Sequence, residues 1–364
     1  MYRKSILFVC IILTLTWSGL IAQNGQSSSK AGIRLIPVWS SQVDSRWQPG
    51  ENIGNADDGI TAEFVEFSQD GKWLVTANGL GDAFVLDARD GKIVKRYTYI
   101  SRKEISRISE FDISGGQMKG METECGAFSP DRRYLILGGN LNGIKVFDLE
   151  SDSMVRHIKV DEEVDGLSVS ADGRFFAHAA EKSARVWDLE TWKSLARVTH
   201  GNKEGVINSI DFTSDARFMA SAGNYGHVIL TRTRDWQQMG DGLVEKPSSI
   251  KSVRFSPDDR YIAAGYGGSS SVAVFDTEDM SLFKFYPLFY IEAVAWSPDG
   301  RYLFAGGRDG QGRLRVYDTA TWEMVGDPEV QADGSNIEYI DFYDDLVAVA
   351  GEDAHVRLYR LEKK

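Results

Sequence analysis

The sequence predicts an all-β protein made of seven consecutive four-stranded antiparallel units, and three observations lead to this fold class. One pattern recurs from about residue 63 to the end of the 364-residue chain. The pattern is an alternating apolar stretch, a turn of the Ser-Pro-Asp-Gly type, a second apolar run, a glycine-containing turn, and a third stretch ending in an aromatic residue and aspartate. Its period of roughly 40 to 45 residues is typical of β-propeller blades, and the two ends of the chain complement each other. We therefore expect a seven-bladed β-propeller.

The residue that precedes the first turn of each unit sets the register. The spacings between these residues are 61, 41, 43, 43, 41 and 46, so the first unit carries an insertion. The seven register residues are Phe67, Phe128, Val169, Phe212, Phe255, Trp296 and Phe342.

An aspartate occupies the same place in the first turn of six units. Such a side chain can accept hydrogen bonds from nearby backbone N–H groups and hold a hairpin turn. Proline precedes it in three units, where a turn favours φ near −65°. The six aspartates are Asp70, Asp131, Asp172, Asp215, Asp258 and Asp299.

The second strand of each unit is expected to lie buried on both faces. The runs Tyr134 to Leu137 and Tyr261 to Ala264 are apolar throughout rather than alternating. Continuous apolar runs suit strands that are covered on both sides, here by neighbouring blades.

The two chain ends together predict how the ring closes. The seventh unit has only three strands, near 337–342, 346–350 and 355–360, while an unpaired strand lies at residues 32–39. If this N-terminal strand becomes the outer strand of the last blade, no open β edge remains at the seam.

The units resemble WD40 repeats over about residues 31–364. The family's Trp-Asp dipeptide is intact once, as Trp187-Asp188. In four other units the third strand ends in a dipeptide with another apolar or aromatic residue in place of Trp: Leu86-Asp87, Phe147-Asp148, Phe275-Asp276 and Tyr317-Asp318.

Other WD40 features are reduced. The Gly-His dipeptide is largely absent, with His200-Gly201 as a candidate remnant, and the Asp of the turn before the third strand is recognisable at Asp353 and less clearly at Asp309. TolB-like propellers share the Ser-Pro-Asp-Gly turns, but the aromatic-Asp followed by an outer strand favours WD40. The resemblance implies a scaffold that binds peptides or proteins on the face carrying the loops between blades, and it implies no catalysis.

The first 22 residues have the pattern of a secretory signal peptide. Arg3 and Lys4 precede an uncharged, mostly apolar stretch that ends at Ala22. We expect cleavage after Ala22, a flexible linker over residues 23–30, and an exported protein, periplasmic or secreted, with no membrane insertion after cleavage. The alternative is an uncleaved membrane anchor, because roughly 17 apolar residues could just span a bilayer.

Charge and motifs narrow the function classes. The formal net charge of −12 argues against a nucleic-acid partner, which needs a basic face, and against docking on anionic lipid.

The catalytic motifs of metalloproteases, hydrolases and P-loop enzymes are missing, so we expect no enzyme, no cofactor and no metal site. The acidic stretch 55–59 has Ala56 where an EF-hand loop needs an oxygen ligand. Cys125 is expected to be a buried, inert thiol.

Two insertions interrupt the repeat on either side of the first blade, at residues 42–61 and 99–122. Long loops on a rigid scaffold often carry function, although tolerated insertions are an equal alternative. Arg and Trp are favoured anchors in protein interfaces. The candidate partner-binding residues are Arg46, Trp47, Arg102, Lys103, Arg107 and Phe111.

The function expected from the sequence is thus an exported binding platform for a protein or peptide on the loop face. One alternative is a propeller enzyme or cofactor-binding propeller acting at the central channel, where Glu66, Asp211 and Glu292 occupy candidate inward positions. Convergence of charged side chains at the channel mouth would favour it. Another is carbohydrate binding through exposed indoles of Trp192, Trp236 and Trp322.

Overall fold

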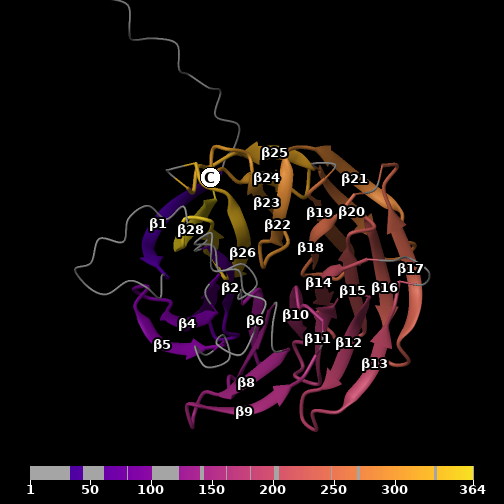
Figure 1. Cartoon of the computed structure of the whole chain (residues 1–364). Helices are drawn as coiled ribbons and strands as arrows, with labels where there is room; N and C mark the ends of the chain where they lie inside the picture. Colours follow the sequence, from indigo (N-terminus) through magenta and orange to yellow (C-terminus); the bar gives the residue numbers. More distant parts are fainter. Residues whose placement is uncertain are drawn as a thin grey trace, which may run out of the picture.

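The computed structural model of this protein describes residues 33–43, 61–79, 81–100, 123–139, 143–160, 162–180, 182–200, 205–246, 248–268, 271–331 and 334–363. These residues form seven four-stranded antiparallel sheets arranged in a ring (Figure 1). The predicted seven-bladed β-propeller is therefore confirmed. In this part of the chain no helix is long and apolar enough to cross a membrane.

The innermost strand of each blade ends at, or one residue beyond, a register residue. Alternation along these strands buries one set of side chains between blades and leaves the other set facing the channel. The inner strands are β2 (Ala62–Phe67), β6 (Cys125–Phe128), β10 (Gly166–Val169), β14 (Ile207–Phe212), β18 (Ile250–Phe255), β22 (Tyr290–Trp296) and β26 (Ile337–Tyr343).

The middle strands of each blade are largely buried, as the continuous apolar runs predicted. The second strands are β3 (Trp73–Asn78), β7 (Tyr134–Gly138), β11 (Phe175–Ala180), β15 (Phe218–Gly223), β19 (Tyr261–Tyr266), β23 (Tyr302–Arg308) and β27 (Leu346–Gly351). The third strands are β4 (Asp82–Asp87), β8 (Ile144–Asp148), β12 (Ser183–Asp188), β16 (His227–Arg232), β20 (Ser271–Asp276), β24 (Arg315–Asp318) and β28 (His355–Lys363).

The outermost strands form the rim of the ring and expose most of their side chains. They are β1 (Ile33–Gln42), β5 (Ile93–Thr98), β9 (Ser153–Ile158), β13 (Ser194–Val198), β17 (Gln237–Leu243), β21 (Leu282–Pro287) and β25 (Glu323–Gly326).

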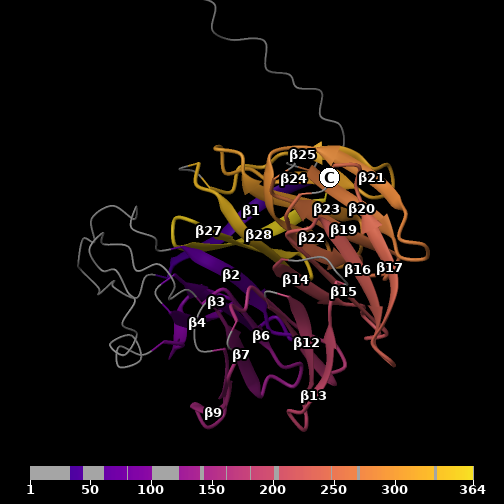
Figure 2. The same ribbon diagram turned by 45° about the vertical axis from the view of Figure 1, so that its right-hand side comes forward.

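The last blade is closed by the N-terminal strand, as predicted. β1 pairs antiparallel with β28 from Ile33 opposite Lys363 to Gln42 opposite His355, with one irregularity between Pro37 and Trp39. Figure 2 shows β1 running alongside β28. The closure leaves no open β edge at the seam, and it ties two ends of the sequence into one hydrogen-bonded sheet.

The first turns have the geometry that their sequence predicted. In the first blade the Ser68 hydroxyl donates to Asp70 at 2.8 Å, and the same carboxylate accepts the backbone N–H of Lys72 at 3.3 Å. Five further blades repeat this arrangement with Asp131, Asp172, Asp215, Asp258 and Asp299. The aspartates are therefore used for turn formation.

Each blade packs its apolar face onto the next, so the core is divided into clusters between neighbouring blades. Antiparallel strand order gives the ring two distinct faces. The turn face carries the turns between first and second strands and between third and fourth strands. The loop face carries the turns between second and third strands and the connections between blades.

Candidate functional site at the channel mouth

A ring of polar side chains surrounds the channel on the loop face. Its members lie four residues before each register residue, just before the inner strand or within its first three residues. Because every blade has the same register, every blade contributes one side chain at the same height. The ring consists of Glu63, Glu124, Asp165, Asn208, Lys251, Glu292 and Glu338.

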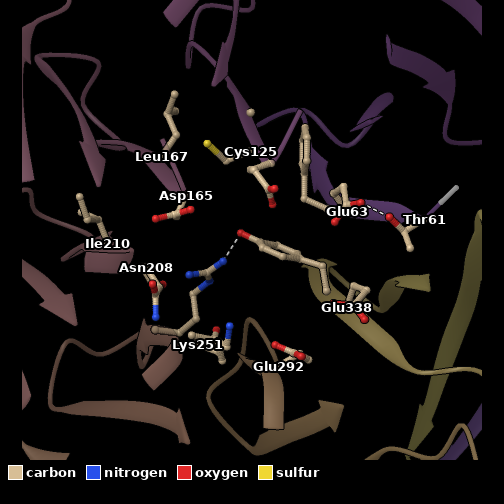
Figure 3. Close-up of a pocket in the computed structure, with 18 of the residues that line it drawn as sticks. Thr61, Glu63, Cys125, Asp165, Leu167, Asn208, Ile210, Lys251, Glu292 and Glu338 are labelled. Atoms are coloured by element: carbon tan, nitrogen blue, oxygen red, sulfur yellow. Dashed lines mark hydrogen bonds between the residues drawn. The ribbon is translucent and has the colours of Figure 1, made fainter. Parts of the chain in front are cut away.

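These side chains line a cavity of about 400 Å³ at the channel mouth. Figure 3 shows Glu63, Asp165, Glu292 and Glu338 arranged around this opening from different blades. Two residues of the loop face, Arg308 and Glu352, complete the charged wall. Among the described residues of the lining, six carboxyl groups stand beside three cationic side chains, so this part of the mouth is rich in acidic groups.

Arg308 is shared between two of these carboxylates. Its guanidinium lies 2.8 Å from Glu292 and 3.6 Å from Glu352. The side chain of Arg308 is half exposed, whereas that of Glu292 is buried. Arg308 therefore compensates only part of the negative charge of the wall.

Glu338 is a partly buried carboxyl group of this wall. Its Oε1 atom is buried and accepts no hydrogen bond from any described group. Burial, followed by the charges of Glu292, Glu63 and Glu352, raises the pKa of Glu338 to about 9. The carboxyl is thus held protonated at neutral pH by its surroundings.

The floor of the mouth cavity is formed by Arg254 of the fifth blade and Tyr339 of the seventh blade. The Arg254 guanidinium donates a hydrogen bond to the Tyr339 hydroxyl and lies 5.1 Å from the centre of the Tyr339 ring. Both residues also line a second cavity of about 310 Å³ that opens toward the turn face. The pair therefore divides the channel into an upper and a lower compartment.

Three carboxyl groups surround Arg254 below the floor. They belong to Glu66, Asp211 and Asp341, each placed one residue before a register residue. Burial raises the pKa of Asp211 and of Asp341 to about 6, and burial raises that of Glu66 as well. The carboxylates of Asp211 and Asp341 also accept the backbone N–H groups of the next blade, at 2.8 and 2.7 Å.

The candidate partner-binding residues of the two insertions, Arg46, Trp47, Arg102, Lys103, Arg107 and Phe111, all lie outside the described residues. The acidic stretch 55–59 lies outside them too. Thr61, the last residue of the first insertion, and Glu124, two residues after the second, are described, and both line the mouth cavity. The chain that follows each insertion thus begins at the acidic mouth.

The three acids named from the sequence do face the channel, but they belong to two different sites. Glu292 lines the mouth, whereas Glu66 and Asp211 lie below the floor. Sequence reasoning missed most of the mouth, including Glu338 and Arg308. The signal was present, because the ring follows from counting four residues back from each register residue.

The comparisons with known proteins agree with the fold. The family model described as "WD domain, G-beta repeat" matches residues 243–276 and 287–318. These segments contain the first three strands of the fifth and sixth blades, ending in Phe275-Asp276 and Tyr317-Asp318. The fifth and sixth blades therefore match WD40 repeats, and the chain as a whole is a propeller similar to WD40-repeat proteins.

Curated relatives of this WD40 propeller include subunits of larger assemblies. The chain is 28% identical over 159 residues to eukaryotic translation initiation factor 3 subunit I of Culex quinquefasciatus, covering 39% of this chain and 47% of that protein. It is 24% identical to the serine-threonine kinase receptor-associated protein of Gallus gallus, covering 55% of each. A guanine nucleotide-binding protein subunit beta of Arabidopsis thaliana is 29% identical over 31% of this chain and 32% of its own. The matches span about half the length of the first relatives or less.

The hydrogen-bond network of WD40 blades survives in fragments, as the sequence indicated. The His200 Nε2 atom lies 2.8 Å from the Ser221 hydroxyl, and both side chains are buried. The Trp187 indole donates to His178 at 3.1 Å, and burial lowers the pKa of His178 to about 3. Both histidines therefore have packing roles.

The three tryptophans proposed for carbohydrate binding are half-buried between blades. Trp192 packs edge-on against Tyr134, and Trp236 does the same against Phe175, at ring distances of 5.4 and 5.3 Å. Trp322 makes the same contact with Tyr261 at 5.4 Å. The WD40 propeller thus uses these indoles to join each blade to the preceding one, and no exposed row is formed.

Proposed function

We propose that this WD40 propeller is a binding platform for a protein or peptide partner, and that the partner docks on the loop face over the acidic mouth. The observation that carries the proposal is the mouth itself, a charged cavity to which all seven blades contribute. A rigid ring presents this surface ready-made, which favours binding with little backbone change. Relatives named as subunits and as a receptor-associated protein support a role in assembly.

The two insertions extend the proposed interface. Residues 42–61 and 99–122 lead into Thr61 and toward Glu124, both on the wall of the mouth. Their Arg, Lys, Trp and Phe side chains would add anchors at the rim of an acidic centre.

A pull-down with tagged protein tests the platform. Lys251→Trp places a bulky side chain in the mouth ring, and a second variant replaces 99–122 by a short Gly-Ser turn. Glu278→Trp, on the turn face, is the matched control. The proposal expects a partner that the parent protein and Glu278→Trp capture and that Lys251→Trp loses. Equal capture by all variants, with each shown to fold by circular dichroism, would remove the mouth from the interface.

A second candidate function has one observation in its favour. Charged side chains do converge at the channel mouth, which is the condition stated above for a channel enzyme. The set is rich in carboxyl groups, and Glu338, protonated at neutral pH, could donate a proton as a general acid. Turnover of a library of uncharged glycosides by the parent protein, lost in Glu338→Gln, would support this function over the platform.

We also propose that residues 1–22 direct export, on the strength of their basic start, apolar stretch and small residue before Gln23. Mass spectrometry of the protein from its native host tests this directly. A mature N-terminus at Gln23 is expected, whereas an intact N-terminus in the membrane fraction would favour the anchor.

A further inference from the structure

The turn between the third and fourth strands places one residue of each of six blades at the same point, four residues after the third strand ends. The backbone there is left-handed, with φ from 55° to 70°. Three of the six residues are tryptophans, and the others are glycine, aspartate and methionine. In chain order the six are Gly91, Asp152, Trp192, Trp236, Met280 and Trp322.

Each of the three tryptophans fills the space between its own blade and the preceding one. Its ring lies edge-on to the aromatic residue that begins the second strand of the preceding blade, at 5.3 to 5.4 Å. The outer strand of the preceding blade also contacts the indole. The Arg156 guanidinium lies 5.3 Å from the centre of the Trp192 ring, and the Phe283 and Trp322 rings are 5.1 Å apart. We call this arrangement an indole site.

The indole site between the first and second blades has no tryptophan, because Asp152 occupies that point of the turn. The Asp152 carboxylate lies 3.1 Å from the Lys95 ammonium group and accepts a hydrogen bond from the Tyr97 hydroxyl at 2.8 Å. It does not fill the space beside Trp73, the residue that begins β3. A cavity of about 290 Å³ lies there instead, open on the turn face, and we call it the inter-blade cavity.

The walls of the inter-blade cavity correspond to the residues that hold an indole at the next interface. Trp73 begins β3 as Tyr134 begins β7, and Lys95 has the place on β5 that Arg156 has on β9. The remaining apolar walls are Val85, Val94, Phe128 and Leu149. The cavity thus has the shape and the contacts of an indole site.

We propose that the inter-blade cavity binds a tryptophan side chain presented by a protein or peptide partner on the turn face. The Lys95 ammonium group would lie over the inserted ring, as the Arg156 guanidinium lies over Trp192. The Asp131 carboxylate, at the edge of the cavity, offers an acceptor for the indole N–H. This site is on the opposite face from the acidic mouth and does not depend on it.

NMR of the indole N–H groups in ¹⁵N-labelled protein, titrated with N-acetyltryptophan amide, tests the inference. The Trp73 signal is assigned by its loss in Trp73→Phe. We expect a Trp73 shift that saturates with a dissociation constant of about 1 mM, the range for a single small ring in a preformed apolar cavity. N-acetylglycine amide, which has no side chain, should cause no saturable shift.

Asp152→Trp fills the cavity from within the chain, as Trp192 does at the next interface. It should abolish the saturable shift of Trp73. It should also raise the midpoint of thermal unfolding by about 2 °C or more above that of Asp152→Asn. Asp152→Asn keeps an acceptor for Tyr97 and leaves the cavity open, so it should bind the probe at least as well as the parent.

Val94→Asp changes the cavity wall at an exposed position that tolerates substitution. Val94 is 44% exposed, and a carboxylate there should weaken binding of the probe about tenfold or more. Leu195→Asp is the matched control, because Leu195 has the same place on β13 and is 43% exposed. Trp236 fills that interface, so the control should bind like the parent.

Each other outcome would overturn the proposal. Absence of a saturable Trp73 shift, or a shift that Asp152→Trp and Val94→Asp leave unchanged, would show that the cavity does not bind an indole. Binding of indole-3-acetate about tenfold tighter than the amide would make it a small-molecule site. Binding seen only after residues 99–122 are replaced by a short Gly-Ser turn would assign the cavity to a segment of this chain. None of these results bears on the mouth, which Lys251→Trp tests separately.

Discussion

The Arg254 guanidinium of the fifth blade lies 5.1 Å from the centre of the Tyr339 ring of the seventh blade, and Arg254 donates a hydrogen bond to the Tyr339 hydroxyl. This contact separates the acidic mouth on the loop face from the three acids below. Both residues line the cavity on each side of the contact.

Arg254 is expected to be needed for stability at neutral pH. Arg254→Met removes the cation enclosed by Glu66, Asp211 and Asp341, and uncompensated carboxylates in such a place cost about 3 kcal/mol. Urea unfolding at pH 7 measures the loss. The loss should shrink at pH 5, where these carboxyl groups bind protons. Lys251→Met, on the same strand at the mouth, serves as the control, and a similar small effect of both variants would contradict the assignment.

Asp211 and Asp341 should make stability fall as pH rises from about 4 to 7. Burial raises the pKa of each to about 6 from an ordinary value of 3.8, so the folded protein binds these protons more tightly than the unfolded chain. Their favourable contribution is complete below pH 4 and is lost as pH rises through about 6.

The double variant Asp211→Asn with Asp341→Asn isolates this effect, because asparagine keeps an acceptor for the backbone N–H groups. Carboxylates with lowered pKa, such as Asp87, change stability in the opposite sense, so the difference between parent and variant is the quantity to measure. We expect that difference to vary by about 1–3 kcal/mol per site between pH 4.5 and 7.5. A difference that is constant with pH would contradict the raised pKa values.

Trp39 and Gly91 should be strongly coupled across the seam between the last blade and the first. The Trp39 indole donates to Ala88 at 2.9 Å, and a Cβ added at Gly91 would lie 2.6 Å from the ring. Gly91 also has φ of 70°, which disfavours any other residue. Gly91→Ala should therefore cost about 2–4 kcal/mol, from backbone strain and overpacking together.

In a Trp39→Ala background the overpacking disappears, so Gly91→Ala should cost only about 1–2 kcal/mol there. Thermal unfolding of the four proteins of this cycle provides the coupling energy. Additive effects would mean that the two residues are not in contact.

Cys125 should resist thiol reagents in the folded protein. The side chain is 7% exposed, and burial raises the pKa of its thiol well above the ordinary value. A fragment spanning residues 31–364, in which Cys125 is the sole cysteine, should react with Ellman's reagent at pH 8 only after unfolding. Rapid reaction of the native fragment would show that the mouth cavity admits the reagent down to β6.

Local features made the fold predictable. Ser68 and Asp70 form a turn with their own neighbours, and five other blades repeat the same chemistry, so the period could be read without knowing any distant contact. The pairing of the N-terminal strand with the last blade could also be predicted. The last unit has only three strands, and a spare strand near Ile33 can pair with it so that neither is left with unpaired backbone groups at the seam.

The candidate site could not be recognised in the sequence as easily as the fold, because its residues are far apart in the chain. Glu63, Glu292 and Glu338 are up to 275 residues apart and look like ordinary exposed positions of alternating strands. Only the closed ring places them around one opening, where burial and mutual repulsion alter their protonation. The scan for known motifs did not detect them, because it compared residues within one segment and not the same position in all seven blades.

The sequence by itself determined the number of blades, their register and the closure of the ring, because turns and strand periodicity are local physical properties. The tertiary structure decided which polar side chains meet. The unpaired Oε1 of Glu338 and the contact of Arg254 with Tyr339 both require blades distant in sequence to be held at fixed positions around one axis.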